Sequence, residues 1–449
     1  MVKKRHIRGA ALCLAVILAL AGCKPEKTVM YETETLPQND GQPARLVVEV
    51  PAGVEGAGPV MEEIVEKYRA DYPQTEISLQ PQGSGAQQPD IRVVTDSGLG
   101  DQADGLLDFS LYADAWYNEG SLGSATGLAM RYMGRQGMYA VPVDVRQDLL
   151  FYRTDWITAH NKGKPWEEQV NLEAWDRAGL MPLLMGEQGR LAISRDKVSR
   201  LFSAVMWSVL GVHTASAPYY SPSKDGLSAT SIFTGENAPS ALITFDRLMG
   251  SVPGGGYADE AGAVQAFING DAGLLIAGSE ALETIRAAMP AESWQVAGLP
   301  AGATTKTATV PCQWVGWGVS RQTAQPEKAV HFLAYLTNAD NNTHMAKVCG
   351  TLPIYREAVS MEPTLLEGAR APEMALLQEA SYRYSGVPRC LEGFCWEESP
   401  FVGQLETYLA GGLSGEELLA QLDALCIRQL DTLKPGWPLP WLEEEEEEG

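Results

Sequence analysis

The sequence predicts an α/β fold, and three kinds of feature indicate it. Short aliphatic runs alternate with segments whose apolar residues recur at helical spacing. Polar, glycine-containing loops follow the aliphatic runs, and the order of run, loop, helix and run is already present from residue 45 onward. Strands and helices that alternate in this way form a parallel sheet with its loops gathered at one edge. We therefore expect mainly parallel sheets covered by helices.

The clearest unit of this kind is residues 264–280 (VQAFINGDAGLLIAGSE). Its first half has the apolar spacing of a helix, and an Asn-Gly pair of the type that ends helices follows. Residues 272–277 (AGLLIA) are short, aliphatic and uncharged, as in strands buried on both faces. Ser279 and Glu280 then open a polar loop at the carboxyl end of this strand, where α/β proteins bind ligands.

The amino-terminal part of the folded chain repeats the pattern. It supplies a strand at 45–50, strands at 75–79 and 89–94, and between the first two a helix with an apolar stripe at Val60, Ile64, Val65 and Tyr68. The polar loop after the second strand contains Ser84. None of the glycine-containing loops has the spacing of a dinucleotide-binding or phosphate-binding motif, so we do not expect a nucleotide ligand.

One later segment predicts a connection between domains, and two further segments predict a strand and a helix. Residues 137–157 (GMYAVPVDVRQDLLFYRTDWI) contain an extended, proline-containing stretch, and few residues in such a stretch can absorb a rigid-body rotation. Residues 312–320 (CQWVGWGVS) predict a strand with Trp317 on one face, packed under a helix. Residues 325–336 predict a helix, with Pro326 at its first position.

The start of the chain has the composition of a lipoprotein signal peptide. Residues 1–8 are basic, residues 9–20 are almost wholly apolar, and Leu-Ala-Gly precedes Cys23. The apolar stretch is too short for a permanent membrane-spanning helix. We expect residues 1–22 to be removed, Cys23 to carry lipid, and residues 23–44 to form a flexible tether.

Charge and length limit the class of partner. The chain has 34 Lys and Arg against 57 Asp and Glu, which disfavours nucleic acid and anionic lipid surfaces as partners. Part of the excess is the run at 443–448, which we interpret as a solvated tail. About 400 residues remain for the folded part, enough for two large lobes.

Signatures of catalysis and of metal binding are missing from the sequence. Its five histidines are scattered, there is no H-E-x-x-H or G-x-S-x-G, and no cysteine spacing matches a zinc site. Carboxylate pairs for glycoside hydrolysis stay open, because such partners can lie far apart in sequence. Cysteines at 390 and 395, or at 312 and 349, could form disulfides, although the odd number leaves at least one thiol unpaired. We expect no cofactor.

Several of these segments together resemble one family. The 264–280 unit, the segment 105–114 (GLLDFSLYAD), the 137–157 stretch and the run from Pro326 through Cys349-Gly-Thr-Leu-Pro are similar to motifs of extracellular solute-binding proteins, the sugar-binding class of ABC importers. The resemblance covers nearly all of residues 45–434. It implies a two-lobe, periplasmic-binding-protein-like fold of type II, with a hinge and an inter-lobe cleft.

The resemblance also implies a division of the chain. We expect the first lobe to comprise residues 45–143 and 300–346, and the second lobe to comprise residues 144–299 and 347–437. Residues 438–449 would form an acidic tail. A ligand contacts both lobes only when they are closed, so ligand binding favours the closed form.

A sugar site needs flat aromatic faces for the apolar side of the ring and planar polar groups for its hydroxyls. The residues expected to contact the ligand are Ser84, Arg146, Asp148, Trp207, Ser279, Glu280, Trp314 and Tyr355. For Trp207 and Trp314 a place in the core is the alternative. Ser279 and Glu280 stand where many family members carry Trp, which leaves an amino sugar, a polyol or another polar solute open beside an oligosaccharide.

The resemblance predicts a function without catalysis. We expect a monomeric receptor, lipid-anchored through Cys23 at the extracellular face of the cytoplasmic membrane, that binds a small polar solute, foremost a carbohydrate, and delivers it to an ABC permease. The alternative is a surface enzyme or a sensor component that keeps the same fold, because fold alone does not determine function.

Overall fold

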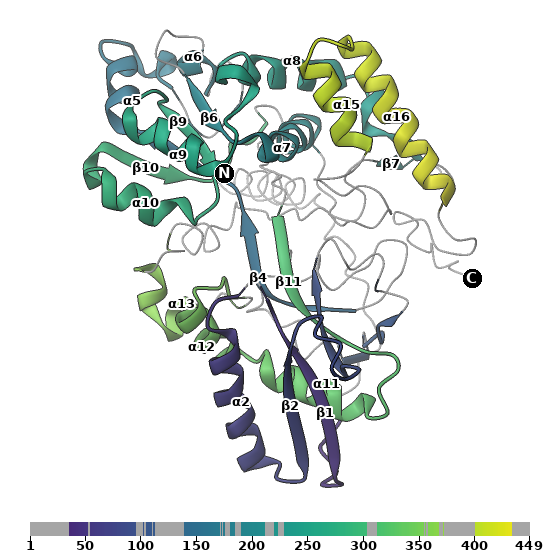
Figure 1. The fold of residues 1–449 in the computed structure, drawn as a ribbon. Coiled ribbons are helices and arrows are strands. Elements are labelled where there is room, and N and C mark those ends of the chain that lie inside the picture. The colour runs from purple at the N-terminus through teal and green to yellow at the C-terminus, as the bar shows by residue number, and fades with distance from the viewer. Residues whose placement is uncertain are drawn as a thin grey trace, which may run out of the picture.

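The computed structural model consists of two lobes, one above the other in Figure 1, each built on its own β-sheet. The residues that it describes are 36–52, 54–95, 102, 105–109, 111–112, 139–170, 172, 174–175, 180–184, 190–211, 220–222, 229–302, 312–353, 355, 358–367, 371 and 400–432. The predicted signal peptide, the lipid site at Cys23, the residues at 390 and 395 and the acidic tail lie outside this set.

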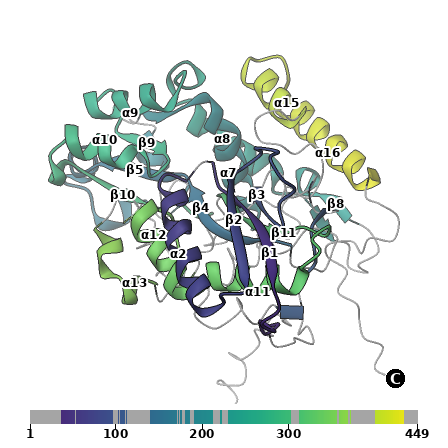
Figure 2. The same ribbon diagram turned by 60° about the horizontal axis from the view of Figure 1, so that its bottom comes forward.

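The first lobe, drawn at the bottom of Figure 1, contains a five-stranded sheet in the order β2-β1-β3-β11-β4. Its strands are β1 (Ala44–Val50), β2 (Thr75–Pro81), β3 (Ile91–Thr95), β4 (Val141–Gln147) and β11 (Cys312–Val319). The first three are parallel, while β11 runs antiparallel to both β3 and β4. The accompanying helices are α2 (Ala57–Asp71), α11 (Pro326–Leu336), α12 (Ala339–Cys349), α13 (Ala358–Met361) and η8 (Pro363–Leu366) (Figure 2).

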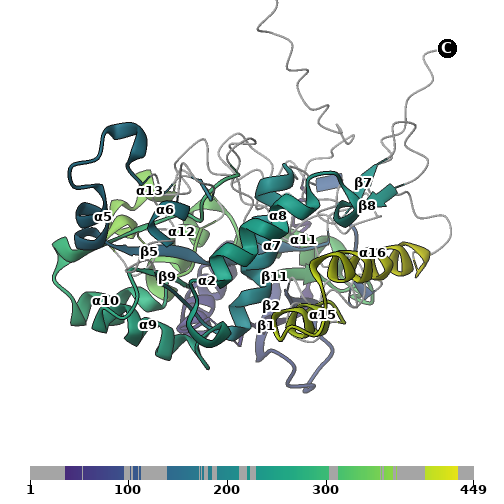
Figure 3. The ribbon, with the colours of Figure 1, turned by 90° about the horizontal axis from the view of Figure 1, so that it is seen from above.

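The second lobe contains a four-stranded sheet in the order β10-β5-β9-β6 and most of the helices (Figure 3). Its strands are β5 (Leu149–Arg153), β6 (Leu191–Ile193), β9 (Leu274–Ala277) and β10 (Trp294–Ala297), and a separate hairpin joins β7 (Tyr220–Pro222) to β8 (Ala229–Ser231). Its α-helices are α5 (Thr154–Asn161), α6 (Met181–Leu184), α7 (Val198–Leu210), α8 (Ala238–Met249), α9 (Glu260–Asn269), α10 (Ala281–Ala288), α15 (Pro400–Leu409) and α16 (Gly415–Thr432). Short 3-10 helices are η3 (Trp166–Glu168), η4 (Arg195–Lys197), η5 (Ile232–Thr234), η6 (Pro253–Gly255) and η7 (Ala291–Ser293).

The predicted unit 264–280 is confirmed. Helix α9 begins at an Asp259 cap, whose carboxylate accepts from the Gly262 amide at 2.8 Å. It ends at Gly270 with a φ of 83°, the left-handed stop that the Asn-Gly pair predicts. Strand β9 follows, and all four of its residues are buried.

The second-lobe sheet is buried on both faces because its side chains alternate. Leu150 and Ile276 pack on one side against α7, α8, α15 and α16, whereas Leu149 and Leu275 pack on the other side against α9 and α10. The first lobe has its own core between its sheet and α2, α11 and α12. Each lobe therefore buries its own apolar surface.

Among the described residues, two segments of chain lead from one sheet to the other. The first changes sheet at Asp148, directly between β4 and β5. The second leaves β10, where Ala301 accepts from the Trp175 amide at 3.0 Å, and returns to the first sheet as β11. Strands β4 and β11 lie very close together, since a side chain at Gly316 would come within 2.1 Å of the Val141 carbonyl oxygen.

The transitions between lobes differ from the predicted boundaries. Strand β4 stays paired with β11 as far as Gln147, so the chain leaves the first sheet later than residue 143. At the other boundary, α12 runs to Cys349 and Tyr355 packs in the first-lobe core, although residues from 347 onward were assigned to the second lobe. In both places hydrogen-bond pairing or apolar packing continues beyond the local sequence signal.

The described end of the expected tether is packed against the first lobe. The Asn39 amide donates to the Tyr68 hydroxyl at 3.3 Å and to Thr75 Oγ1 at 3.2 Å. Its oxygen accepts from the Lys328 ammonium at 2.6 Å, and Asp40 forms an ion pair with the same ammonium. The prediction of a flexible tether as far as residue 44 is therefore wrong for this part, because polar partners on α2 and α11 were invisible in its composition.

Candidate functional site

The junction of the lobes is where β4 and β11 extend from the first sheet toward the second lobe (Figure 1). Polar loops follow the parallel strands of each sheet, and Asp144, Arg146 and Asp148 lie on the first crossing itself. The carboxyl ends of parallel strands share one edge, so these loops and the crossing define the region where a ligand of this fold is expected.

On the first-lobe side the loop after β2 carries Ser84, which is exposed. The buried carboxylate of Glu49, near the end of β1, positions this loop. It accepts from the Gly83 amide at 3.2 Å and from the Val93 amide at 2.8 Å. One side chain on β1 thus binds both β3 and the loop after β2, which fixes the place of Ser84.

The crossing begins with a second buried carboxylate. Asp144 accepts from the Leu352 amide at 2.9 Å and from Arg146 Nε at 2.9 Å. The Arg146 side chain remains 51% exposed. Asp144 therefore orients a guanidinium that still presents polar surface at the junction, and this arrangement supports the prediction that Arg146 contacts the ligand.

The crossing ends in a buried ion cluster. Asp148 accepts from Lys197 Nζ at 2.6 Å and from an Arg200 terminal nitrogen at 2.7 Å, and Lys197 also pairs with Glu260 at 2.7 Å. Burial by itself would raise the pKa of Asp148, but the charges of Arg200 and Lys197 outweigh it and hold the pKa below its usual value. Asp148 stays ionised and ties the crossing to α7 and α9.

On the second-lobe side Ser279 and Glu280 follow β9, as predicted. Ser279 is buried, with its carbonyl oxygen accepting from the Leu282 amide at 3.0 Å, and Glu280 is exposed. Strand β6 is parallel to β9 and ends beside it at Ile193. Ser194 therefore lies at the same edge, and its buried hydroxyl has no hydrogen-bond partner among the described residues.

The three aromatic residues predicted to contact the ligand differ in their surroundings. Trp207 is fully buried in the core between α7 and its neighbours, and Tyr355 is 3% exposed in the first-lobe core. Neither has surface that a ligand could contact, so both residues pack in the core instead of contacting the ligand as predicted. Trp314 is 7% exposed on β11 opposite Val145 and belongs to none of the described core clusters. Its contact with a ligand stays a prediction.

Sequence reasoning missed Glu49, Ser194, Lys197 and Arg200. Glu49 could have been found as an acidic residue inside an aliphatic strand, because a buried carboxylate needs hydrogen-bond donors. Ser194 follows a short apolar run in the manner of a strand-end loop residue. Lys197 and Arg200 had no local signal, since their partners lie about fifty residues away.

Among the described residues there is no cluster of metal ligands, and Cys349 forms no disulfide. Within the described ranges no three His, Cys, Asp or Glu side chains gather as metal ligands would. The Cys349 thiol is free, so the bridge to the residue at 312 is not formed, and burial and then Asp144 raise its pKa to about 11. None of the described helices is both long and apolar enough to cross a bilayer.

A family model for bacterial extracellular solute-binding proteins matches residues 63–374, well over half of the chain. The chain belongs to this family. The match includes the first crossing, the ion cluster and the 264–280 unit, so the resemblance inferred from the motifs is confirmed. A comparison with curated protein sequences gives no match.

Solved structures with the same fold span nearly the whole described molecule. The sugar-binding protein of Xanthomonas citri is 16% identical, with a TM-score of 0.64, over 86% of this chain and 97% of that one. The maltodextrin-binding protein of L. casei BL23 is 14% identical, with a TM-score of 0.64, over 85% and 97%. The cyclic maltosyl-maltose-binding protein of Arthrobacter globiformis is 16% identical, with a TM-score of 0.61, over 86% and 99%. The type II fold of this solute-binding protein is thereby confirmed.

Proposed function

We propose that this solute-binding protein is the carbohydrate-binding component of an ABC importer, which holds its solute between the lobes and delivers it to the permease. The observation that carries the proposal is the family match over a fold whose two lobes place polar loops around the crossing strands. Proteins of this fold bind maltodextrin and a cyclic maltosyl-maltose, according to their descriptions. Ligand contacts made by both lobes together favour a closed form.

The polar groups described at the junction suit hydroxyl recognition. Arg146 offers planar donors, Glu280 offers acceptors from the second lobe, and Ser84 offers a hydroxyl from the first. These groups bind and orient a solute but supply no nucleophile activated by a base. We infer that the protein is not an enzyme, and that binding requires no cofactor.

Binding is tested with the whole mature protein and a panel of mono- and oligosaccharides, polyols, amino sugars and amino acids. A true ligand at a hundredfold excess over its dissociation constant stabilises the fold by about 3 kcal/mol, which a thermal-shift assay detects. Chromatography of the recovered compound checks for turnover. A shift from carbohydrates with no product supports the proposal, whereas product formation or a shift from amino acids alone contradicts it.

A matched pair of variants locates the site. Arg146→Ala removes the half-exposed guanidinium of the crossing and should weaken solute binding about tenfold or more. Arg45→Ala removes a guanidinium that is 70% exposed, at the amino-terminal end of β1 and paired with Glu76, and should leave binding unchanged. Equal effects of the two changes would place the solute elsewhere.

The membrane attachment is a separate part of the proposal. We infer that Cys23 carries lipid and holds the protein at the extracellular face of the cytoplasmic membrane. Cells grown with labelled fatty acid should incorporate the label into the protein, and Cys23→Ser should abolish labelling while leaving solute binding intact. Label retained in Cys23→Ser would contradict the anchor and leave the carbohydrate proposal untouched.

A further inference from the structure

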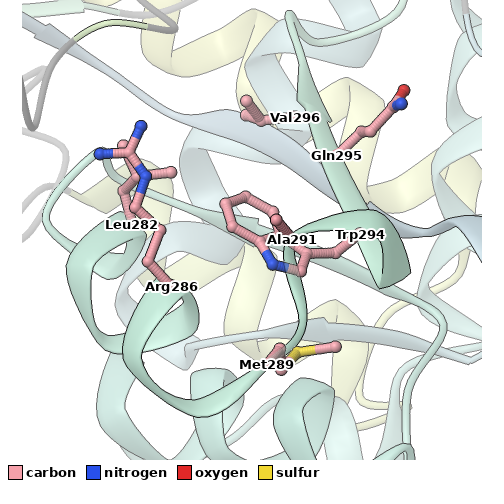
Figure 4. Close-up of a pocket in the computed structure, with 7 residues that line it drawn as sticks. All are labelled: Leu282, Arg286, Met289, Ala291, Trp294, Gln295 and Val296. Atoms are coloured by element: carbon pink, nitrogen blue, oxygen red, sulfur yellow. The ribbon is translucent and has the colours of Figure 1, made fainter. Parts of the chain in front are cut away.

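A pocket on the second lobe is lined by residues other than those predicted to contact the solute. It has a volume of about 570 Å³ and is formed by α10, η7 and β10. Its lining residues are Leu282, Arg286, Met289, Ala291, Trp294, Gln295 and Val296 (Figure 4). None of them is among the residues predicted to contact the solute, and the volume falls in the range of small-molecule sites.

The pocket exists because α10 leaves part of β10 uncovered. Strand β10 is the outermost strand of its sheet as described, paired on one side with β5. Leu282, Met289 and Trp294 belong to the core on this face of the sheet, and Val296 packs against it. The floor of the pocket is therefore the open margin of a hydrophobic core.

Two of the polar side chains at the pocket, Arg286 and Trp294, carry only hydrogen-bond donors. Figure 4 shows the Arg286 side chain on one side of the Trp294 ring, while the Gln295 amide points away from the other six residues. Arg286 is exposed and makes no ion pair or hydrogen bond within the described structure. The indole N–H of Trp294, a residue only 8% exposed, is buried and likewise lacks a partner among the described residues.

These features select a class of ligand. Arg286 is a cation in a strongly acidic protein, and a guanidinium recognises a carboxylate with paired hydrogen bonds. The aliphatic and aromatic floor favours a hydrocarbon body beside the anionic group.

We propose that the α10–β10 pocket is a second binding site, distinct from the solute site, for a small amphipathic carboxylate. The carboxylate pairs with Arg286, and the hydrocarbon part covers Leu282, Trp294 and Val296. The site lies on β10, which continues into the return crossing and pairs with β5, the strand that follows Asp148 directly.

The test uses the whole mature protein labelled with ¹⁵N at its eleven tryptophans, with octanoate as probe and octanol as its uncharged control. Trp294→Phe identifies the Trp294 indole signal. Octanoate at millimolar concentration should shift that signal saturably, and Arg286→Gln should weaken binding at least tenfold, while the other indole signals confirm that the variant is folded.

Arg247→Gln is the matched control, because Arg247 is an exposed helical arginine of the same lobe, on α8, away from the pocket. It should bind octanoate like the unaltered protein. The proposal is overturned if the Trp294 signal does not respond, if octanol binds as tightly as octanoate, or if Arg286→Gln and Arg247→Gln behave alike.

Discussion

Buried carboxylates are satisfied differently in the two lobes. In the first lobe they accept mainly from backbone amides: Glu49 from Gly83 and Val93, and Asp144 from Leu352. The partly buried Asp90 likewise accepts from the Val47 amide at 2.8 Å. In the second lobe Asp148 is held by the side-chain cations of Lys197 and Arg200.

The difference matters because removing the carboxylate has different consequences for the two kinds of partner. A carboxylate bound to amides fixes the loop that donates them, and its removal leaves only neutral groups unpaired. A carboxylate bound to buried cations holds helices to the crossing, and its removal leaves uncompensated charge. The first lobe therefore shapes loops locally, while the second is attached to the crossing through electrostatics.

The largest effect is expected from Asp148→Ala. The change leaves Lys197 and Arg200 in the interior without their shared anion and should lower the free energy of unfolding by about 3–5 kcal/mol. Urea denaturation at neutral pH measures it. Asp155→Ala is the control, because the Asp155 carboxylate is 56% exposed and pairs with Arg153. Its loss should lower the free energy of unfolding by less than about 1 kcal/mol. Similar losses in the two variants would show that the cluster contributes no more than a surface pair.

A smaller loss is expected from Glu49→Ala. The Gly83 and Val93 amides lose their acceptor, which should cost about 1–3 kcal/mol. The same denaturation experiment applies, with Glu55→Ala as control because Glu55 is exposed in the next loop and has no described partner. If Glu49→Ala proves more damaging than Asp148→Ala, the contrast between the lobes fails.

Lys328 is the exception within the first lobe, since it is a buried cation that binds Asn39 and Asp40. Lys328→Met should cost about 1 kcal/mol, because Asp40 is largely exposed, and should speed amide exchange in residues 39–44. Hydrogen exchange followed by mass spectrometry measures the release. Lys347→Met, which breaks an exposed pair with Glu362, should leave that segment protected. Unchanged exchange in Lys328→Met would mean that other contacts hold the segment.

The smallest expected effect is a difference in acid sensitivity. Burial, and then the charge of Lys328, hold the pKa of His331 below its ordinary 6.5. Below about pH 6.5 the unfolded chain binds a proton that the folded protein resists, so stability falls as pH drops through the lowered pKa. Asp148 contributes at all pH values above 3.8 and loses its contribution only below that value, because its folded pKa is held lower still.

Urea midpoints at pH 7 and pH 5 test this order. His331→Gln should lose less stability over that interval than the unaltered protein. His344→Gln changes a partly exposed histidine beside Glu63 and serves as control. An undiminished loss in His331→Gln would assign the acid sensitivity to other groups.

Local sequence signals predicted which segments form helices and strands, but not which residues pack against distant parts of the chain. The stripe on the first helix was correct, since Val60, Ile64, Val65 and Tyr68 are all buried in α2. The Asn-Gly stop and the following strand were correct for the same reason, because backbone conformation and burial act within a few residues there. The tether and Trp207 were misjudged because both depend on partners distant in sequence.

Composition, periodicity and motifs in the sequence by themselves determined the α/β class, the two-lobe family fold, the stretch that contains the first crossing and the loops with Ser84, Ser279 and Glu280. Only the tertiary structure decided that Asp148 lies between two cations and that the described end of the tether is packed. It also decided that α10 leaves a pocket beside β10. Secondary structure follows from short-range backbone and side-chain preferences, whereas ion pairing and pocket shape depend on which distant segments the packing brings together.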